Sequence, residues 1–398
     1  MVGIAQPDNF SIFIRKIGYS VGLENTLERF SDFCHQYISV PQIKQKDWLE
    51  LVHNKWNLKT NNIADVFSSL GIVEVTQQGV FAGPIGEAGA ICLKVLTGAD
   101  EQRRAMKHLL ALAILLSDGD IFLNCLAAQF RTENVRDSLR KMVIGKRQQL
   151  FEVFRTQAEK EAIAAAITIE RQKTNKGGAS KGGLNALRTG GLNSGLGKLG
   201  LPQPKDVFQM DPPSSDYLRH VLPARREWAR TLGLVGESKD GGVTELGWQW
   251  LQVFGDAGFA LPSGEYSLRP TRFELEKARL GSMPLLAEYA PSTWSYVRNV
   301  AMALGATECA AEISSEEPKI LAETTKSMFE LYREFAQDRR MVRNELPLQV
   351  ALSTYMALCC STGKRLVNYD SWLRSDASAS FGIKTRTSRT IELGIIVT

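Results

Sequence analysis

The sequence predicts a mainly α-helical fold in which short β-hairpins follow helices and long helices join the resulting units. Two patterns lead to this prediction. Apolar residues recur at the spacing of amphipathic helices, and one arrangement of helices and hairpin occurs twice. The chain has 398 residues, of which 44% are hydrophobic and 23% charged, values typical of a soluble globular protein with two or three domains.

The first arrangement covers about residues 40–97 of a helical domain that we expect to span residues 1–130. Asn25 stands where a helix cap is expected, with Glu28 at the capping-box position. The alternation Ile72-Val73-Glu74-Val75 predicts a strand, which a glycine-containing turn joins to a short return strand. Apolar spacing predicts helices around this hairpin, over 25–38, 47–54, 62–70 and 85–96.

The second arrangement lies in residues 206–260, within "SSDYLRHVLPARREWARTLGLVGESKDGGVTELGWQWLQVF". Pro223 suits the first turn of a helix, and Gly233 is expected to end that helix. Leu234-Val235 begins a strand, a polar turn follows, and Thr244 caps a last helix that carries two tryptophans.

Both arrangements resemble the winged-helix superfamily, and "LGLV…GGVTELG" is similar to many winged-helix domains. An ordinary helical hairpin with a short β-turn is the alternative for the second one. Residues 346–398 end in the β-rich "FGIKTRTSRTIELGIIVT" after a helix over 346–361 and a short helix over 370–374, so we expect a C-terminal winged-helix-like unit there. The resemblance thus implies tandem winged-helix-like domains, with residues 261–345 as a helical connector.

Positive charge is concentrated in the middle of the chain. The net charge is +5, but residues 131–205 hold 15 Lys/Arg and 6 Asp/Glu, so the rest of the chain is negative. We expect a long basic helix there, from about residue 132 to 173, followed by a glycine-rich segment. Such concentrated charge favours a polyanionic partner, nucleic acid before membrane, although a solvated basic face would look the same.

The glycine-rich segment contains a match to GxGxxG at residues 195–200. A dinucleotide site needs a buried strand before this motif and a helix after it. Here a polar glycine-rich stretch precedes the motif and Leu201-Pro202 follows it, so we interpret the match as accidental. We expect a flexible arm that lays basic residues along phosphates, or a tether between two halves; these residues are Lys176, Lys181, Arg188 and Lys198.

The second winged-helix-like unit is the predicted DNA reader. The helix before its hairpin carries Arg225, Arg226 and Arg230, and its wing carries Lys239. Arginine pairs with guanine edges or with phosphates. The alternative is that these arginines pair with Glu227 or with solvent. The first unit carries Asp65, Glu74 and Glu87 and has no Lys or Arg between Lys59 and Lys94, so we expect it to contact a protein instead.

Catalysis, a metal and a cofactor are not expected. The four histidines have no metal-ligand spacing, and no GxSxG motif is present. Asp118 and Asp120 in "SDGDIF" suggest a turn and a helix cap. Glu237 and Lys239, with Asp216 upstream, match part of a metal-dependent nuclease motif, but they fall on the predicted wing.

Three functional hypotheses follow. The first is a non-enzymatic nucleic-acid-binding protein, duplex DNA being favoured, that serves as a subunit of a larger DNA-processing or defence assembly. The second is a helical scaffold whose winged helices mediate protein contacts, and the third is a metal-dependent nuclease. The six cysteines form no CxxC motif and no apolar run reaches the length of a membrane span, so we expect a cytoplasmic protein.

Overall fold

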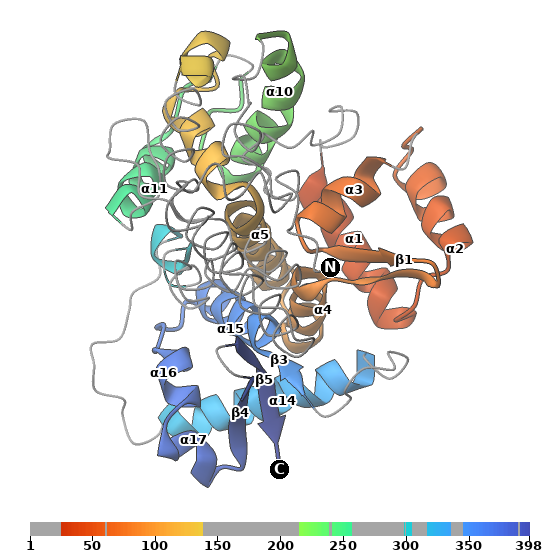
Figure 1. Cartoon of the computed structure of the whole chain (residues 1–398), viewed down its shortest axis with the longest axis vertical. Coiled ribbons are helices and arrows are strands. Elements are labelled where there is room, and N and C mark those ends of the chain that lie inside the picture. Colours follow the sequence, from red (N-terminus) through yellow and green to blue (C-terminus); the bar gives the residue numbers. More distant parts are fainter. Residues whose placement is uncertain are drawn as a thin grey trace, which may run out of the picture.

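The computed structural model describes residues 25–59, 62–137, 215–238, 241–256, 298, 300–304, 317–335, 345–388 and 391–398. These residues are mainly helical with a few short strands, which confirms the predicted structural class. In Figure 1 the long helix α5 (Ala99–Ala127) lies at the centre, with α10 and α11 above it and the C-terminal elements below it. Of the predicted basic helix, residues 132–137 are helical, and the rest lies outside the described residues.

The N-terminal unit begins with α1 (Thr26–Ser39), α2 (Gln45–Glu50), a π-helical turn (Leu51–Lys55) and α3 (Asn62–Ser69). An antiparallel hairpin of β1 (Val73–Thr76) and β2 (Gly79–Ala82) follows, where the sequence predicts one. Ile43 forms a further antiparallel bridge with Val80. The last strand, β2, therefore lies between Ile43 and β1.

The predicted cap of α1 is wrong. An N-capping asparagine needs an extended backbone so that its side chain can reach the first free N–H groups. Asn25 instead has a left-handed backbone, with φ 68° and ψ 28°, and its side chain makes no capping hydrogen bond. Its backbone carbonyl accepts a hydrogen bond from the N–H of Arg29 at 3.0 Å, so the main chain alone starts this helix.

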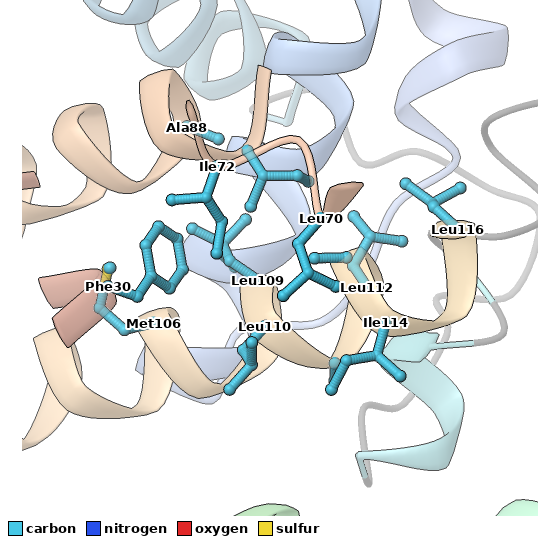
Figure 2. Close-up of a cluster of buried hydrophobic side chains, with 14 of the residues drawn as sticks. Phe30, Leu70, Ile72, Ala88, Met106, Leu109, Leu110, Leu112, Ile114 and Leu116 are labelled. Atoms are coloured by element: carbon cyan, nitrogen blue, oxygen red, sulfur yellow. The ribbon is translucent and has the colours of Figure 1, made fainter. Parts of the chain in front are cut away.

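The core lies between α1, α4 (Pro84–Val95), α5 and α15 (Leu348–Thr362), which pack on one another. Figure 2 shows Phe30 of α1 and Ile72 packed with Met106 and Leu109 of α5. These four side chains are at most 1% exposed. Helix α15 buries residues on all of its sides, and these include the polar residues Gln349, Ser353 and Thr354.

The predicted turn at Asp118 and Asp120 is wrong, because α5 continues through both residues to Ala127. Gly119 between them is buried, and Leu116 and Phe122 on either side are fully buried. Burial of these apolar neighbours in the core outweighs the local preference of aspartate and glycine for a turn.

The second unit consists of α10 (Ser215–Leu232) and α11 (Glu245–Asp256). Pro223 lies inside α10 and does not begin it, so the predicted helix start is wrong. Gly233 ends α10 with φ 79°, as predicted. Val235 and Val243 form an isolated antiparallel bridge, which closes the expected short hairpin.

The C-terminal elements begin with α14 (Glu317–Phe335) and β3 (Leu346–Pro347), followed by α15, α16 (Tyr369–Leu373) and α17 (Asp376–Ser380). The chain then forms the antiparallel hairpin of β4 (Ile383–Ser388) and β5 (Ile391–Val397). The sheet order is β3-β5-β4, so the last strand again lies in the middle, as Figure 1 shows.

Candidate nucleic-acid interface

The α10–α11 hairpin holds three of the arginines predicted to contact DNA. Trp228, Trp250 and Phe254 form its buried core, and the rings of Trp250 and Phe254 meet edge to face with centroids 5.5 Å apart. Thr244 caps α11 as predicted, because its hydroxyl accepts a hydrogen bond from the N–H of Gly247 at 3.2 Å. The same hydroxyl donates to the carbonyl of Gly233 at 2.7 Å, so Thr244 ties the two helix ends together.

The three arginines interact within this unit. Arg225 is fully buried and has its own interactions, so its guanidinium is not available at the surface. The Nη2 group of Arg226 donates a hydrogen bond to the carbonyl of Gly241 at 3.1 Å. Arg230 forms an ion pair with Glu227, and these two side chains are only 27% and 23% exposed. Of the three, Arg230 pairs with Glu227, as the alternative reading of the sequence expects, and the role of the three arginines in binding DNA stays a prediction.

The remaining predicted contacts cannot be placed. Residue 239 in the predicted wing lies outside the described residues, and so does the predicted basic arm with Lys176, Lys181, Arg188 and Lys198. Their role in binding nucleic acid stays a prediction.

The fragments of the nuclease motif do not form a metal site among the described residues. Asp216 is 85% exposed and its carboxylate lies 3.5 Å from Arg219, one turn along α10. Glu237 is also exposed. In the described part of the chain, no group of three His, Cys, Asp or Glu side chains is placed to hold a metal ion.

The acidic surface predicted for the first unit is smaller than expected. Asp65 on α3 and Glu74 on β1 are exposed, whereas Glu87 on α4 is only 3% exposed and belongs to the interior. Helix α4 follows the hairpin directly and packs into the core, so Glu87 does not contribute to an acidic surface. The candidate protein-contacting face therefore consists of α3 and β1.

Sequence reasoning missed a group of cations that α5 and the end of α15 bring together. Arg104 donates from Nε to the carbonyl of Ser361 at 3.0 Å, so the first turns of α5 lie against the C-terminal end of α15. These turns also carry Arg103 and Lys107, and the chain leaving α15 carries Lys364 and Arg365. The two segments are 257 residues apart in sequence, which is why no local pattern revealed the group.

Comparisons of the chain with protein-family models, with curated proteins and with solved structures found no match. Within the described ranges, no helix is both long enough and apolar enough to cross a membrane.

A pocket of about 460 Å³ lies beside Lys364 and Arg365. Leu321 and Met328 of α14 and Leu358 of α15 give it an apolar lining, while Lys364 and Arg365 line it from the segment after α15. Cys359 also lines the pocket, and burial raises the pKa of its thiol to about 11. That thiol is therefore protonated near neutral pH, where a nucleophilic cysteine would need to be a thiolate.

Proposed function

We propose that this chain is a non-catalytic, winged-helix-like protein that binds duplex DNA as a subunit of a larger assembly. The strand order supports the proposal. The N-terminal and the C-terminal unit share one order of elements: a helix, a bridge or short strand, further helices and a hairpin. In both units the last strand of the hairpin, β2 or β5, pairs with the first strand of the hairpin on one side and with the earlier bridge or strand on the other. This is the arrangement expected of a winged helix, in which the hairpin lies beside the last helix and both face the same ligand.

Charge supports DNA as the ligand of the C-terminal unit. Its hairpin carries Lys384, which is exposed, and Arg386, whose side chain is 51% exposed and pairs with Glu345 at 3.2 Å. Together with the basic middle of the sequence, these cations suit contacts to the phosphate backbone. The N-terminal unit, with Asp65 and Glu74 exposed, would repel phosphates and is proposed to contact a protein partner.

The scaffold hypothesis is the second candidate, and the α10–α11 hairpin favours it. Its arginines are engaged with Gly241 and Glu227, so this unit offers little free positive charge to DNA. If every unit behaves in this way, the winged-helix-like units only hold proteins together. We further propose a cytoplasmic location, which is supported by the free cysteines Cys34, Cys92, Cys125, Cys359 and Cys360.

Titration of the purified full-length chain with a labelled duplex at several salt concentrations tests the proposal. Binding should weaken with salt, with a slope of log K against log salt of about −0.9 for each contacted phosphate. Lys384→Gln should make that slope less steep by about one contact, whereas the matched control Lys326→Gln, on exposed α14 surface, should not. Absence of binding at low salt would leave the scaffold as the better hypothesis, and magnesium-dependent cleavage of the duplex would revive the nuclease.

A further inference from the structure

We propose that the phosphate backbone of the bound duplex rests on a cationic surface formed by the start of α5 and the segment that leaves α15. This surface, the α5–α15 cationic surface, consists of Arg103, Arg104, Lys364 and Arg365, whereas the ammonium group of Lys107 on α5 lies near Gly233 at the end of α10. The inference rests on the proposed function, since it assigns the place where the DNA lies. It also explains how the chain can bind DNA although the arginines of α10 are engaged elsewhere.

One hydrogen bond and one turn bring the two halves of the surface together. The bond from Arg104 to the carbonyl of Ser361 fixes α5 against the last turn of α15. Gly363 then takes a left-handed backbone with φ 69°, and the N–H of Lys364 bonds the carbonyl of Cys359 at 3.0 Å. This helix ending is the common one with a C-terminal glycine. It turns the chain sharply, so Lys364 and Arg365 emerge at the same end of α15 that Arg104 contacts.

The positive charges of this surface are poorly compensated. Arg103, Lys364 and Arg365 are exposed, and no ion pair with another described residue neutralises them. Arg104 donates to a neutral carbonyl rather than to a carboxylate. Lys107 is half-buried, and its pKa is lowered by burial and by the neighbouring charge of Arg103. The phosphates of a polyanion would compensate these exposed charges.

The pKa of the buried His108 side chain is also affected by the positive charges of α5. Its side chain is 7% exposed, and its Nδ1 atom has no hydrogen-bond partner among the described residues. Burial, and after it the positive charges of Lys107 and Arg104, lower its pKa to about 4. The imidazole is thus neutral near neutral pH, and the charges that act on it most are those of Lys107 and Arg104.

The acids around the surface limit where the DNA can lie. Asp100 and Glu101 are in the first turn of α5, and Glu317 and Glu323 line the pocket from α14. Phosphates would avoid the α14 side of Lys364 and Arg365 and approach from the side of Arg103. Flexible lysine and arginine side chains spread over two segments suit several phosphates along a backbone, and they have no fixed geometry for reading base edges.

The test compares two triple variants of the full-length chain that change net charge equally. The first, Arg103→Gln with Lys364→Gln and Arg365→Gln, removes three exposed cations of the surface. The control, Lys46→Gln with Lys319→Gln and Lys326→Gln, removes three exposed lysines from other places. Arg104 is kept, because its bond to Ser361 holds α5 and α15 together. Melting temperatures of both variants are compared with the parent chain to verify that folding is intact.

We expect the slope of log K against log salt to become less negative by about 2 to 3 in the first variant, because each lost phosphate contact removes about −0.9 from the slope. The control should change the slope by less than about 0.9. Equal slopes for parent and first variant, with the parent still binding, would overturn the α5–α15 assignment and leave the proposed function standing. No binding by the parent chain would overturn both. Loss of slope on single-stranded RNA but not on the duplex would also overturn the inference.

Discussion

Arg226 and Gly241 are joined by a hydrogen bond that crosses the turn between α10 and α11, from the guanidinium Nη2 to the backbone carbonyl at 3.1 Å. The N–H of Gly236 bonds the carbonyl of Gly242 at 3.0 Å, next to the bridge between Val235 and Val243. A side chain on α10 thus holds Gly241 against the helix. Arg226 therefore has a structural use that does not involve a ligand.

We predict that Arg226→Ala lowers the stability of the chain by about 1 kcal/mol, because the partly buried hydrogen bond to the carbonyl of Gly241 is lost. Arg219→Ala on the same helix is the matched control. It removes a 69% exposed partner of Asp216, and such surface pairs contribute at most about 1 kcal/mol. Chemical denaturation followed by tryptophan fluorescence measures both. Equal stability of the Arg226 variant and the parent would show that the bond contributes nothing to folding.

We predict that Gly247→Ala destabilises the α10–α11 hairpin, whereas Gly242→Ala does not. A Cβ atom on Gly247 would lie 2.3 Å from the carbonyl oxygen of Leu234 and 2.6 Å from a methyl group of Val243, whereas a Cβ on Gly242 would have no atom within 4 Å. Relief of the Gly247 overlap requires α11 to move away from the strand, at a cost of about 1 to 3 kcal/mol. Thermal melting of the two variants side by side gives the comparison. Similar melting temperatures would contradict this packing.

His108 should make the chain less stable as pH falls. Its folded-state pKa of about 4 lies below the ordinary value, so between about pH 6.5 and pH 4 the unfolded chain binds a proton that the folded chain does not. This contribution to stability is therefore complete above about pH 6.5 and is lost on acidification, by about 2 kcal/mol between pH 7.5 and about pH 5. His108→Leu should reduce the loss by that amount, as measured from unfolding free energies at the two pH values.

The control for His108 is His35→Leu, which replaces an exposed imidazole on α1 by the same residue and shows what a change from histidine to leucine does at the surface. An identical pH dependence for His108→Leu and the parent would contradict the burial of a neutral imidazole at this position.

Local signals in the sequence predicted the elements that depend on local chemistry. Gly233 ends α10 and Thr244 caps α11, because a left-handed backbone and a free helix N-terminus each select few residue types. The prediction that Pro223 begins a helix was wrong. Pro223 lies inside α10, because the residues on both sides of it are buried and the helix extends further towards the N-terminus. Local propensity loses to packing in such cases.

The candidate site depends even more on tertiary contacts that a local sequence pattern does not reveal. Charge and spacing indicated Arg226 as a DNA contact, but only the folded chain shows that its guanidinium bonds Gly241. The contact between Arg104 and Ser361 joins residues that are 257 positions apart, so no window of sequence contains both. Which cations remain free at the surface depends on tertiary contacts of this kind.

The last prediction concerns the central position of β5. Ile395 pairs with Leu346 of β3 and with Thr385 of β4, and its side chain is fully buried. Its neighbour Ile396 points to the opposite face of the strand and is only partly buried. Ile395→Ala should therefore cost about 2 to 5 kcal/mol, the usual range for a cavity at a buried isoleucine, and Ile396→Ala clearly less.

Denaturant unfolding of these two variants tests which face of β5 is buried, because both remove the same atoms from adjacent positions of one strand. The difference between the variants should be large, since only the side chain of Ile395 is fully buried. Equal losses, or a larger loss for Ile396→Ala, would contradict the observed orientation of β5, and a strand shifted by one residue would exchange the two faces.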